Sequence, residues 1–382
     1  MERTFARCQE ILADLDLGEV KRWKASRPGG KAIGYFPVYA PVEIMHAAGM
    51  LPVGLAGAGD RLDIQYADAR FGSFICSIVK TTLELGLTGH LKPLDGLVFS
   101  SICDSARNLC FVMQRNFPEL YLDFLHLPHN PNSPASADFL AAEYRRLADN
   151  LERLGGVQVT PTGLRNALGL YNRNRQLVRQ LYQLRASHPH LLAAWESYLL
   201  VRAGYFLPVE EHSSLMEEAL ATLPHRPGRG RDSLRVVVEG AFCEQPPLDL
   251  IKLLEAAGCY LVDDDFAMGR NWFLDEVPLE GDPLSNLAEA YLHQARYSSV
   301  RHDFRHPRWE ELVQKVRHTR ADAVIFLIAK FCEPAYFDYV LFRKRLEELG
   351  IPSLLLEFEE KMFTFERLRT EVETFVESMV FD

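Results

Sequence analysis

The stretch KAIGYFPVYAPVEIMHAAGMLPVGLA, residues 31–56, carries the pattern that decides the fold. Residues 31–36 are a predicted strand, residues 41–48 a short helix with Pro41 in its first turn, and residues 51–56 a second strand. Gly49 ends the helix. This order predicts two parallel strands whose connecting helix covers a face of the sheet.

The same alternation occurs on both sides of a helical middle. Towards the N-terminus, strands are predicted at 94–99 and 120–125 around a helix at 104–117. The C-terminal part repeats the plan, with strands at 234–239, 259–262, 323–329 and 351–357 and helices at 248–257, 335–349 and 365–379. Helical spacing covers 135–154, 164–186, 191–204 and 212–223, and the Pro- and Gly-rich segment 224–233 is a predicted linker. The sequence thus predicts an α/β fold of two Rossmann- or flavodoxin-like lobes with parallel sheets, residues 1–160 and 231–382, joined by a helical segment, residues 161–230.

Composition excludes several classes of protein. The chain has 382 residues and a formal net charge of −10, and its basic residues form no cluster typical of nucleic-acid binding. Its longest apolar run, residues 323–329, is far too short to cross a membrane, and the charged N-terminus lacks the apolar core of a signal peptide. We therefore expect a cytoplasmic enzyme whose seven cysteines are reduced thiols.

Three cysteines share a position relative to the predicted strands. Cys103, Cys243 and Cys332 each follow the carboxyl end of a strand, which is where open parallel sheets bind their ligands. This placement favours a metal or cofactor site, against the alternative that the cysteines are small buried hydrophobic residues. The spacing is not specific, because the chain has no C-x₂-C pair. Cys8, Cys110 and Cys259 are interpreted as core residues.

Several motifs carry a resemblance to a known family. The run YFPVYAPVEIMHAAGMLP at 35–52, SICD at 101–104 with Arg107-Asn108, and KFCEP at 330–334 resemble the 2-hydroxyacyl-CoA dehydratase/benzoyl-CoA reductase superfamily. The run FCEQPPL at 242–248 and the acidic run at 263–265 resemble the smaller, cluster-carrying subunit (the gamma or C type) of ATP-dependent benzoyl-CoA reductase. The resemblance covers almost the whole chain.

The resemblance implies an iron–sulfur enzyme. Cys76, Cys103 and Cys332 match the cysteines that hold a [4Fe–4S] cluster in the family, and three thiolates leave one iron open to another ligand. The implied reaction reduces the aromatic ring of benzoyl-CoA to a cyclohexadiene-carbonyl-CoA with low-potential electrons. The implied partners are a second, homologous cluster-bearing subunit, ATPase subunits with their own [4Fe–4S] cluster, and ferredoxin as the upstream donor. This chain has no G-x₄-G-K-[ST] loop, so the ATP-driven step is assigned to a partner.

Further polar residues are candidates for the cleft. His46 is a candidate proton donor, with the alternative of a satisfied helix histidine, and Glu244 is the second candidate catalytic residue. Gln245 adjoins it in the same motif. Glu43 and Asp104 are either cleft groups or helix N-terminal acids.

Two other functions remain open. One is a subunit of a 2-hydroxyacyl-CoA dehydratase, which would share the fold and the cluster but catalyse no net redox change. The other is a metal-free, two-lobed binding module in which every cysteine serves packing.

Overall fold

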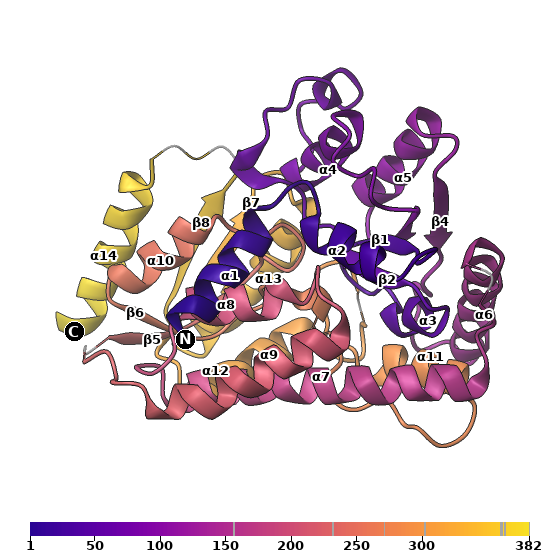
Figure 1. Cartoon of the computed structure of the whole chain (residues 1–382). Coiled ribbons are helices and arrows are strands. Elements are labelled where there is room, and N and C mark those ends of the chain that lie inside the picture. Colours follow the sequence, from indigo (N-terminus) through magenta and orange to yellow (C-terminus); the bar gives the residue numbers. More distant parts are fainter. Residues whose placement is uncertain are drawn as a thin grey trace.

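The computed structural model describes residues 1–155, 157–230, 233–270, 272–301, 303–359, 362 and 364–381, with only the backbone described at 270, 380 and 381. Two four-stranded sheets form its centre (Figure 1). The first contains β1 (Ala32–Phe36), β2 (Leu51–Gly54), β3 (Gly96–Ser100) and β4 (Tyr121–Leu125) in the order β2-β1-β3-β4. The second contains β5 (Leu234–Glu239), β6 (Cys259–Asp263), β7 (Ala323–Ala329) and β8 (Ser353–Phe358) in the order β6-β5-β7-β8. All pairings within these sheets are parallel, so the predicted α/β class with two lobes is confirmed, and both lobes follow one strand order.

Helices connect the strands and cover the sheets. In the first lobe these are α3 (Val42–Ala47), α4 (Ser77–Leu87) and α5 (Asp104–Asn116); in the second they are α10 (Leu248–Ala256), α12 (Arg308–Thr319), α13 (Glu333–Glu348) and α14 (Glu366–Phe381). The central strands β1, β3 and β7 are buried along their whole length, as expected for parallel strands covered on both faces.

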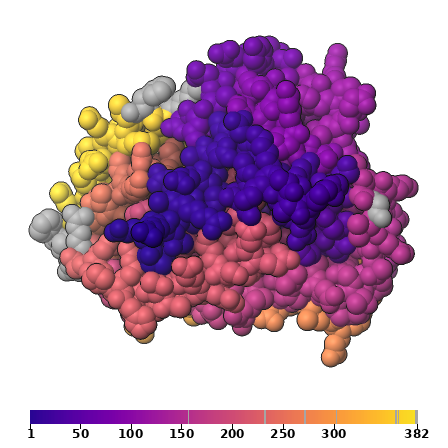
Figure 2. Space-filling view, in the orientation of Figure 1, coloured from indigo at the N-terminus to yellow at the C-terminus, as the bar shows by residue number. Residues whose placement is uncertain are grey.

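The helical middle packs against both lobes. It contains α6 (Ser136–Gly155), α7 (Pro161–Ser187), α8 (Ala194–Ala203) and α9 (Val209–Thr222). In Figure 1 the long helix α7 runs beneath the molecule, and it packs against α3 of the first lobe and β6 of the second. The N-terminal helix α1 (Glu2–Ala13) packs on α8 and is followed by α2 (Gly18–Ser26), while α11 (Pro283–Gln294) returns to pack on α6 and α7. The N-terminal segment crosses the face on which the two lobes meet (Figure 2).

Several helix and strand ends differ from the sequence prediction, and two of these differences have identifiable reasons. Strand β2 ends at Gly54 rather than at residue 56, because the Gly54 N–H donates to the carbonyl oxygen of Tyr205 at 2.9 Å. A Cβ at Gly54 would lie 2.6 Å from the Tyr205 ring, so this close approach requires glycine. Helix α7 begins at Pro161 rather than at residue 164, since the Thr160 side chain accepts from the Gly163 N–H at 3.0 Å and caps it.

The predicted linker at 224–233 falls partly outside the described residues, because residues 231 and 232 are not described. Helices α2, α4, α11 and α12 were not predicted. In α4 the sequence SIVKTTLELGL mixes β-branched residues with a glycine, which weakens the helical signal. None of the helices in the described part of the chain combines the length and the apolar character needed to span a bilayer.

Candidate functional site

Four cysteines lie where the two sheets present the carboxyl ends of their strands. Cys103 follows β3 and Cys332 follows β7, as predicted, and Cys243 lies in the loop between β5 and α10. Cys76 precedes α4. All seven cysteines of the chain are free thiols.

Three of the four occupy the same local position, the residue that caps a helix N-terminus. Cys76 precedes α4, Cys103 precedes α5 and Cys332 precedes α13. The Cys103 sulfur accepts from the Ala106 N–H at 3.4 Å. The unpaired N–H groups and the positive end of a helix dipole stabilise negative charge at this position, so three helices favour thiolate at these cysteines.

Burial acts against this effect. It is the main cause that raises the pKa of Cys332 to about 12, and it raises the pKa values of Cys76, Cys103 and Cys243 as well. Without a positive partner, burial outweighs the helix N-termini and these groups are neutral thiols at neutral pH. Thiols of this kind become thiolates when a metal replaces the proton.

The four thiols are neighbours in space. After burial, the pKa of Cys76 is raised by Glu244, Cys332 and Cys103, and that of Cys243 by Cys332, Cys103 and Cys76. Within the described residues, no three or more His, Cys, Asp or Glu side chains are grouped closely enough to hold a metal ion. The fold therefore gathers cysteines from both lobes into one region without forming a compact single-ion site.

Glu244 connects the two lobes at this region. Its carboxylate accepts from the Ser77 hydroxyl and from the Ile78 N–H at 3.1 Å, so it binds the first turn of α4 immediately after Cys76. Glu244 is 8% exposed. The structure thus brings this predicted site residue together with the cysteines, and it adds Ser77, whose partner no sequence pattern could reveal.

The loop that carries Cys243 and Glu244 is held by its neighbours. The Gln245 amide donates to the Cys243 carbonyl at 3.1 Å and accepts from the Ala267 N–H at 2.9 Å. Asp265 accepts from the Gly240 and Ala241 N–H groups at 2.8 and 3.0 Å. Asp265 is a supporting residue to which the sequence analysis gave no structural role; its position two residues after β6 was the available signal.

The other predicted polar residues lie elsewhere. His46 is in the last turn of α3, with its ring edge-on to Tyr171 and its Nε2 3.8 Å from a Glu210 carboxylate oxygen. Because α3 leads from the carboxyl end of β1 to the amino end of β2, its last turn lies away from the strand ends that carry the cysteines.

Glu43 and Asp104 are also outside the cysteine group. Glu43 is fully buried and forms an ion pair with Arg175 of α7. The Asp104 side chain is 84% exposed and pairs with Arg107 at 2.9 Å. A buried structural ion pair and a helix N-terminal acid are the roles that these contacts support.

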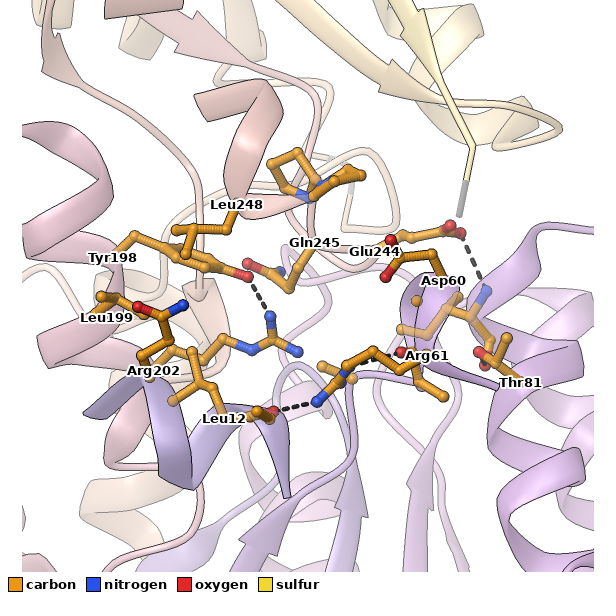
Figure 3. A pocket seen from close by; sticks show the side chains of 18 residues that line it. Leu12, Asp60, Arg61, Thr81, Tyr198, Leu199, Arg202, Glu244, Gln245 and Leu248 are labelled. Atoms are coloured by element: carbon orange, nitrogen blue, oxygen red, sulfur yellow. Dashed lines mark hydrogen bonds between the residues drawn. The ribbon is translucent and has the colours of Figure 1, made fainter. Parts of the chain in front are cut away.

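Glu244, which lies beside the cysteines, also lines a cavity of about 200 Å³ (Figure 3). It is formed by α1, the segment after β2, α4, α8 and the end of the loop before α10. Arg61 and Arg202 reach into it, with Tyr198, Thr81, Glu244 and Gln245 on its walls.

The chain is similar to proteins of known function along almost its whole length. A family model described as "2-hydroxyglutaryl-CoA dehydratase, D-component" matches residues 37–379. The chain is 38% identical to the C subunit of benzoyl-CoA reductase from Thauera aromatica, over 98% of this chain and 97% of that protein. It is 32% identical to the beta subunit of lactoyl-CoA dehydratase from Anaerotignum propionicum, with 92% of each chain covered. It is also 27% identical to the beta subunit of (R)-2-hydroxyglutaryl-CoA dehydratase from Acidaminococcus fermentans, over 93% of this chain and 94% of that protein.

Proposed function

Because the chain belongs to the family of the 2-hydroxyglutaryl-CoA dehydratase D-component, we propose that it is the C-type subunit of an anaerobic benzoyl-CoA reductase. The family membership predicted from the sequence motifs is confirmed. The observation that carries the reductase assignment is the match to the C subunit of a benzoyl-CoA reductase, at 38% identity over 97% of that protein. The complex would reduce the aromatic ring of benzoyl-CoA to a cyclohexadiene-carbonyl-CoA.

The proposal includes a [4Fe–4S] cluster held by Cys76, Cys103 and Cys332. The donor set fits such a group: partly buried thiols from two lobes lie in one region, and three of them stand at the N-cap positions of helices, where negative charge is favoured. A cubane places each thiolate on a different iron, so its ligands need not converge on a single point as the ligands of one ion do. When bound, the cluster would accept and pass on single electrons at low potential.

The residues of this chain would control the surroundings of that group. The partial burial of the four thiols limits their contact with water, which strengthens local electrostatic interactions. Glu244 would hold the Cys76 turn against the second lobe through Ser77 and Ile78. Gln245 and Asp265 would fix the conformation of the Cys243 loop.

The proposal also includes partner subunits. The relatives are named as subunits, which supports a hetero-oligomer, and the chain lacks a phosphate-cradling loop of the G-x₄-G-K-[ST] type. We therefore assign the energy input to separate ATPase subunits with their own [4Fe–4S] cluster, to which ferredoxin supplies electrons. This chain would pair with a homologous cluster-bearing subunit.

Anaerobic purification of the chain co-expressed with its homologous partner tests the cluster. We expect a brown protein with about four iron atoms and four sulfides for each [4Fe–4S] cluster and an electron paramagnetic resonance signal on reduction. A colourless, iron-free complex that is folded would contradict the proposal.

A dehydratase subunit is the second candidate, because the family model and two of the relatives carry dehydratase names. The two functions differ in their product. Formation of a cyclohexadiene-carbonyl-CoA from benzoyl-CoA identifies a reductase, whereas formation of an enoyl-CoA from a 2-hydroxyacyl-CoA, with no net electron consumption, identifies a dehydratase.

A further inference from the structure

Two arginines of separate elements share the cavity beside Glu244. Arg61 comes from the short helical turn Gly59–Arg61 after β2, and Arg202 comes from α8. In Figure 3 their guanidinium groups point towards one another inside the cavity. Two positive charges in one cavity repel each other, and an anion bound between them would relieve that repulsion.

The protein itself supplies little compensation. In the part of the chain that the structure describes, neither guanidinium forms an ion pair with a carboxylate. Arg61 donates to the carbonyl oxygens of Ala58, at 2.9 Å, and Leu12, while Arg202 donates to the Tyr198 hydroxyl. The Arg202 Nε is buried and has no hydrogen-bond partner.

The two charges act on each other. Although part of Arg61 is exposed, its surroundings lower its pKa to about 10, first through burial and then through the positive charge of Arg202. Tyr198 and Asp60 raise the pKa of Arg61, with smaller effects than burial and Arg202. Glu244 lines the same cavity, but its carboxylate accepts from Ser77 and Ile78 on the side of α4.

We propose that this cavity binds a phosphate group between Arg61 and Arg202. The guanidinium fork matches phosphate oxygens in a bidentate manner, and an anion would supply the charged partner that both arginines lack among the described residues. The cavity, at about 200 Å³, far exceeds the ~10–15 Å³ that one water needs, so a phosphate and accompanying waters fit, while a larger molecule would extend outside.

The source of the phosphate is either coenzyme A or a free phosphate compound. A coenzyme A source rests on the proposed function, because the thioester substrate carries phosphate groups remote from its acyl end. Inorganic pyrophosphate represents the free source, and pantetheine, which lacks the phosphates of coenzyme A, is the matched negative probe.

Calorimetric titration of the complex purified with its partner tests the site, with coenzyme A, pyrophosphate and pantetheine as the three probes. We expect coenzyme A or pyrophosphate to bind, with affinity falling as salt rises. Arg202→Gln and Arg61→Gln should each weaken binding at least about tenfold, the equivalent of one charge-assisted hydrogen bond. Arg202→Lys, which keeps the charge but loses the fork, should weaken it less.

Arg173→Gln is the matched control. Arg173 is a half-exposed arginine of α7 that pairs with Glu217, so its loss should leave binding unchanged. Binding of coenzyme A with loss in the Arg202 variant identifies the substrate as the source, and binding of pyrophosphate alone identifies a free phosphate.

The proposal is overturned if neither phosphate compound binds the unmodified complex, if pantetheine binds as tightly as coenzyme A and pyrophosphate does not bind, or if the Arg61 and Arg202 variants bind normally. Thermal melting shows whether each variant is folded, and if Arg202→Gln is not, Arg202→Lys, which keeps the charge, decides whether this cavity holds the phosphate. Iron content is measured in parallel, so a failure of this inference is distinguishable from a failure of the cluster proposal.

Discussion

Glu244 and Ser77, 167 positions apart, form a buried hydrogen bond between the two lobes directly beside Cys76. The adjacent Ile78 N–H donates to the same carboxylate, so two donors at the start of α4 hold one side chain of the opposite lobe. The geometry of the cysteine region therefore depends on how the lobes meet.

Replacement of Glu244 by alanine should weaken both folding and cluster retention. It leaves the Ser77 hydroxyl and the Ile78 N–H without their acceptor, which costs on the order of 1–3 kcal/mol of unfolding free energy. Anaerobic urea unfolding and the rate of iron loss to a chelator measure the two effects. Glu217→Ala, at a half-exposed glutamate, is the control, and equal behaviour of the two variants would contradict the role given to Glu244.

Cysteine replacements should separate ligands from core residues. Cys103→Ala and Cys332→Ala should abolish the cluster, because each removes one of the three proposed thiolates. Cys8→Ala, Cys110→Ala and Cys259→Ala should keep it and cost on the order of 1 kcal/mol of stability, since each removes one buried heavy atom. Iron analysis measures the outcome, and full iron content in the Cys332 variant would refute the ligand assignment.

Cys243 should behave differently from both groups. Cys243→Ala should retain its iron, because the three proposed ligands remain, but it should shift the paramagnetic resonance spectrum, since a partly buried thiol next to the other three is lost. Loss of the iron would instead make Cys243 a ligand.

His46 should contribute to acid sensitivity rather than to turnover. Burial is the main cause that lowers its pKa below the usual value of 6.5, so the folded state binds a proton less readily than the unfolded state. The stability linked to neutral His46 is present above about pH 6.5 and is lost as the pH falls from there through the lower pKa of the folded state.

His46→Gln should therefore lose less unfolding free energy than the unmodified protein between pH 7 and pH 5, while ring reduction is kept. Urea unfolding at both pH values and a turnover assay at pH 7 measure this. A folded His46→Gln complex without activity would contradict this prediction and support His46 as a proton donor.

The sequence predicted the elements whose signals are local. Residues 323–329 form a strand with the predicted bounds, since an uninterrupted apolar run of this length has few alternatives in a covered parallel sheet. The positions of Cys103 and Cys332 at strand ends followed from the same pattern.

Contacts between distant segments were not predictable in this way. The partners of Glu244, the ion pair of Glu43 with Arg175 and the meeting of Arg61 with Arg202 all depend on how the helical middle orients the lobes. A helix-terminal acid and a buried ion-pair partner have the same local sequence, so only the fold could distinguish them for Glu43.

The most direct test of the central claim is a product assay with the complete complex. Purified anaerobically with the homologous subunit and the ATPase subunits, it is given benzoyl-CoA, reduced ferredoxin and ATP, and its products are separated by chromatography. We predict a cyclohexadiene-carbonyl-CoA that requires ATP and disappears when this chain carries Cys332→Ala. Unchanged benzoyl-CoA in the unmodified complex, together with dehydration of a 2-hydroxyacyl-CoA by the same preparation, would contradict the assignment.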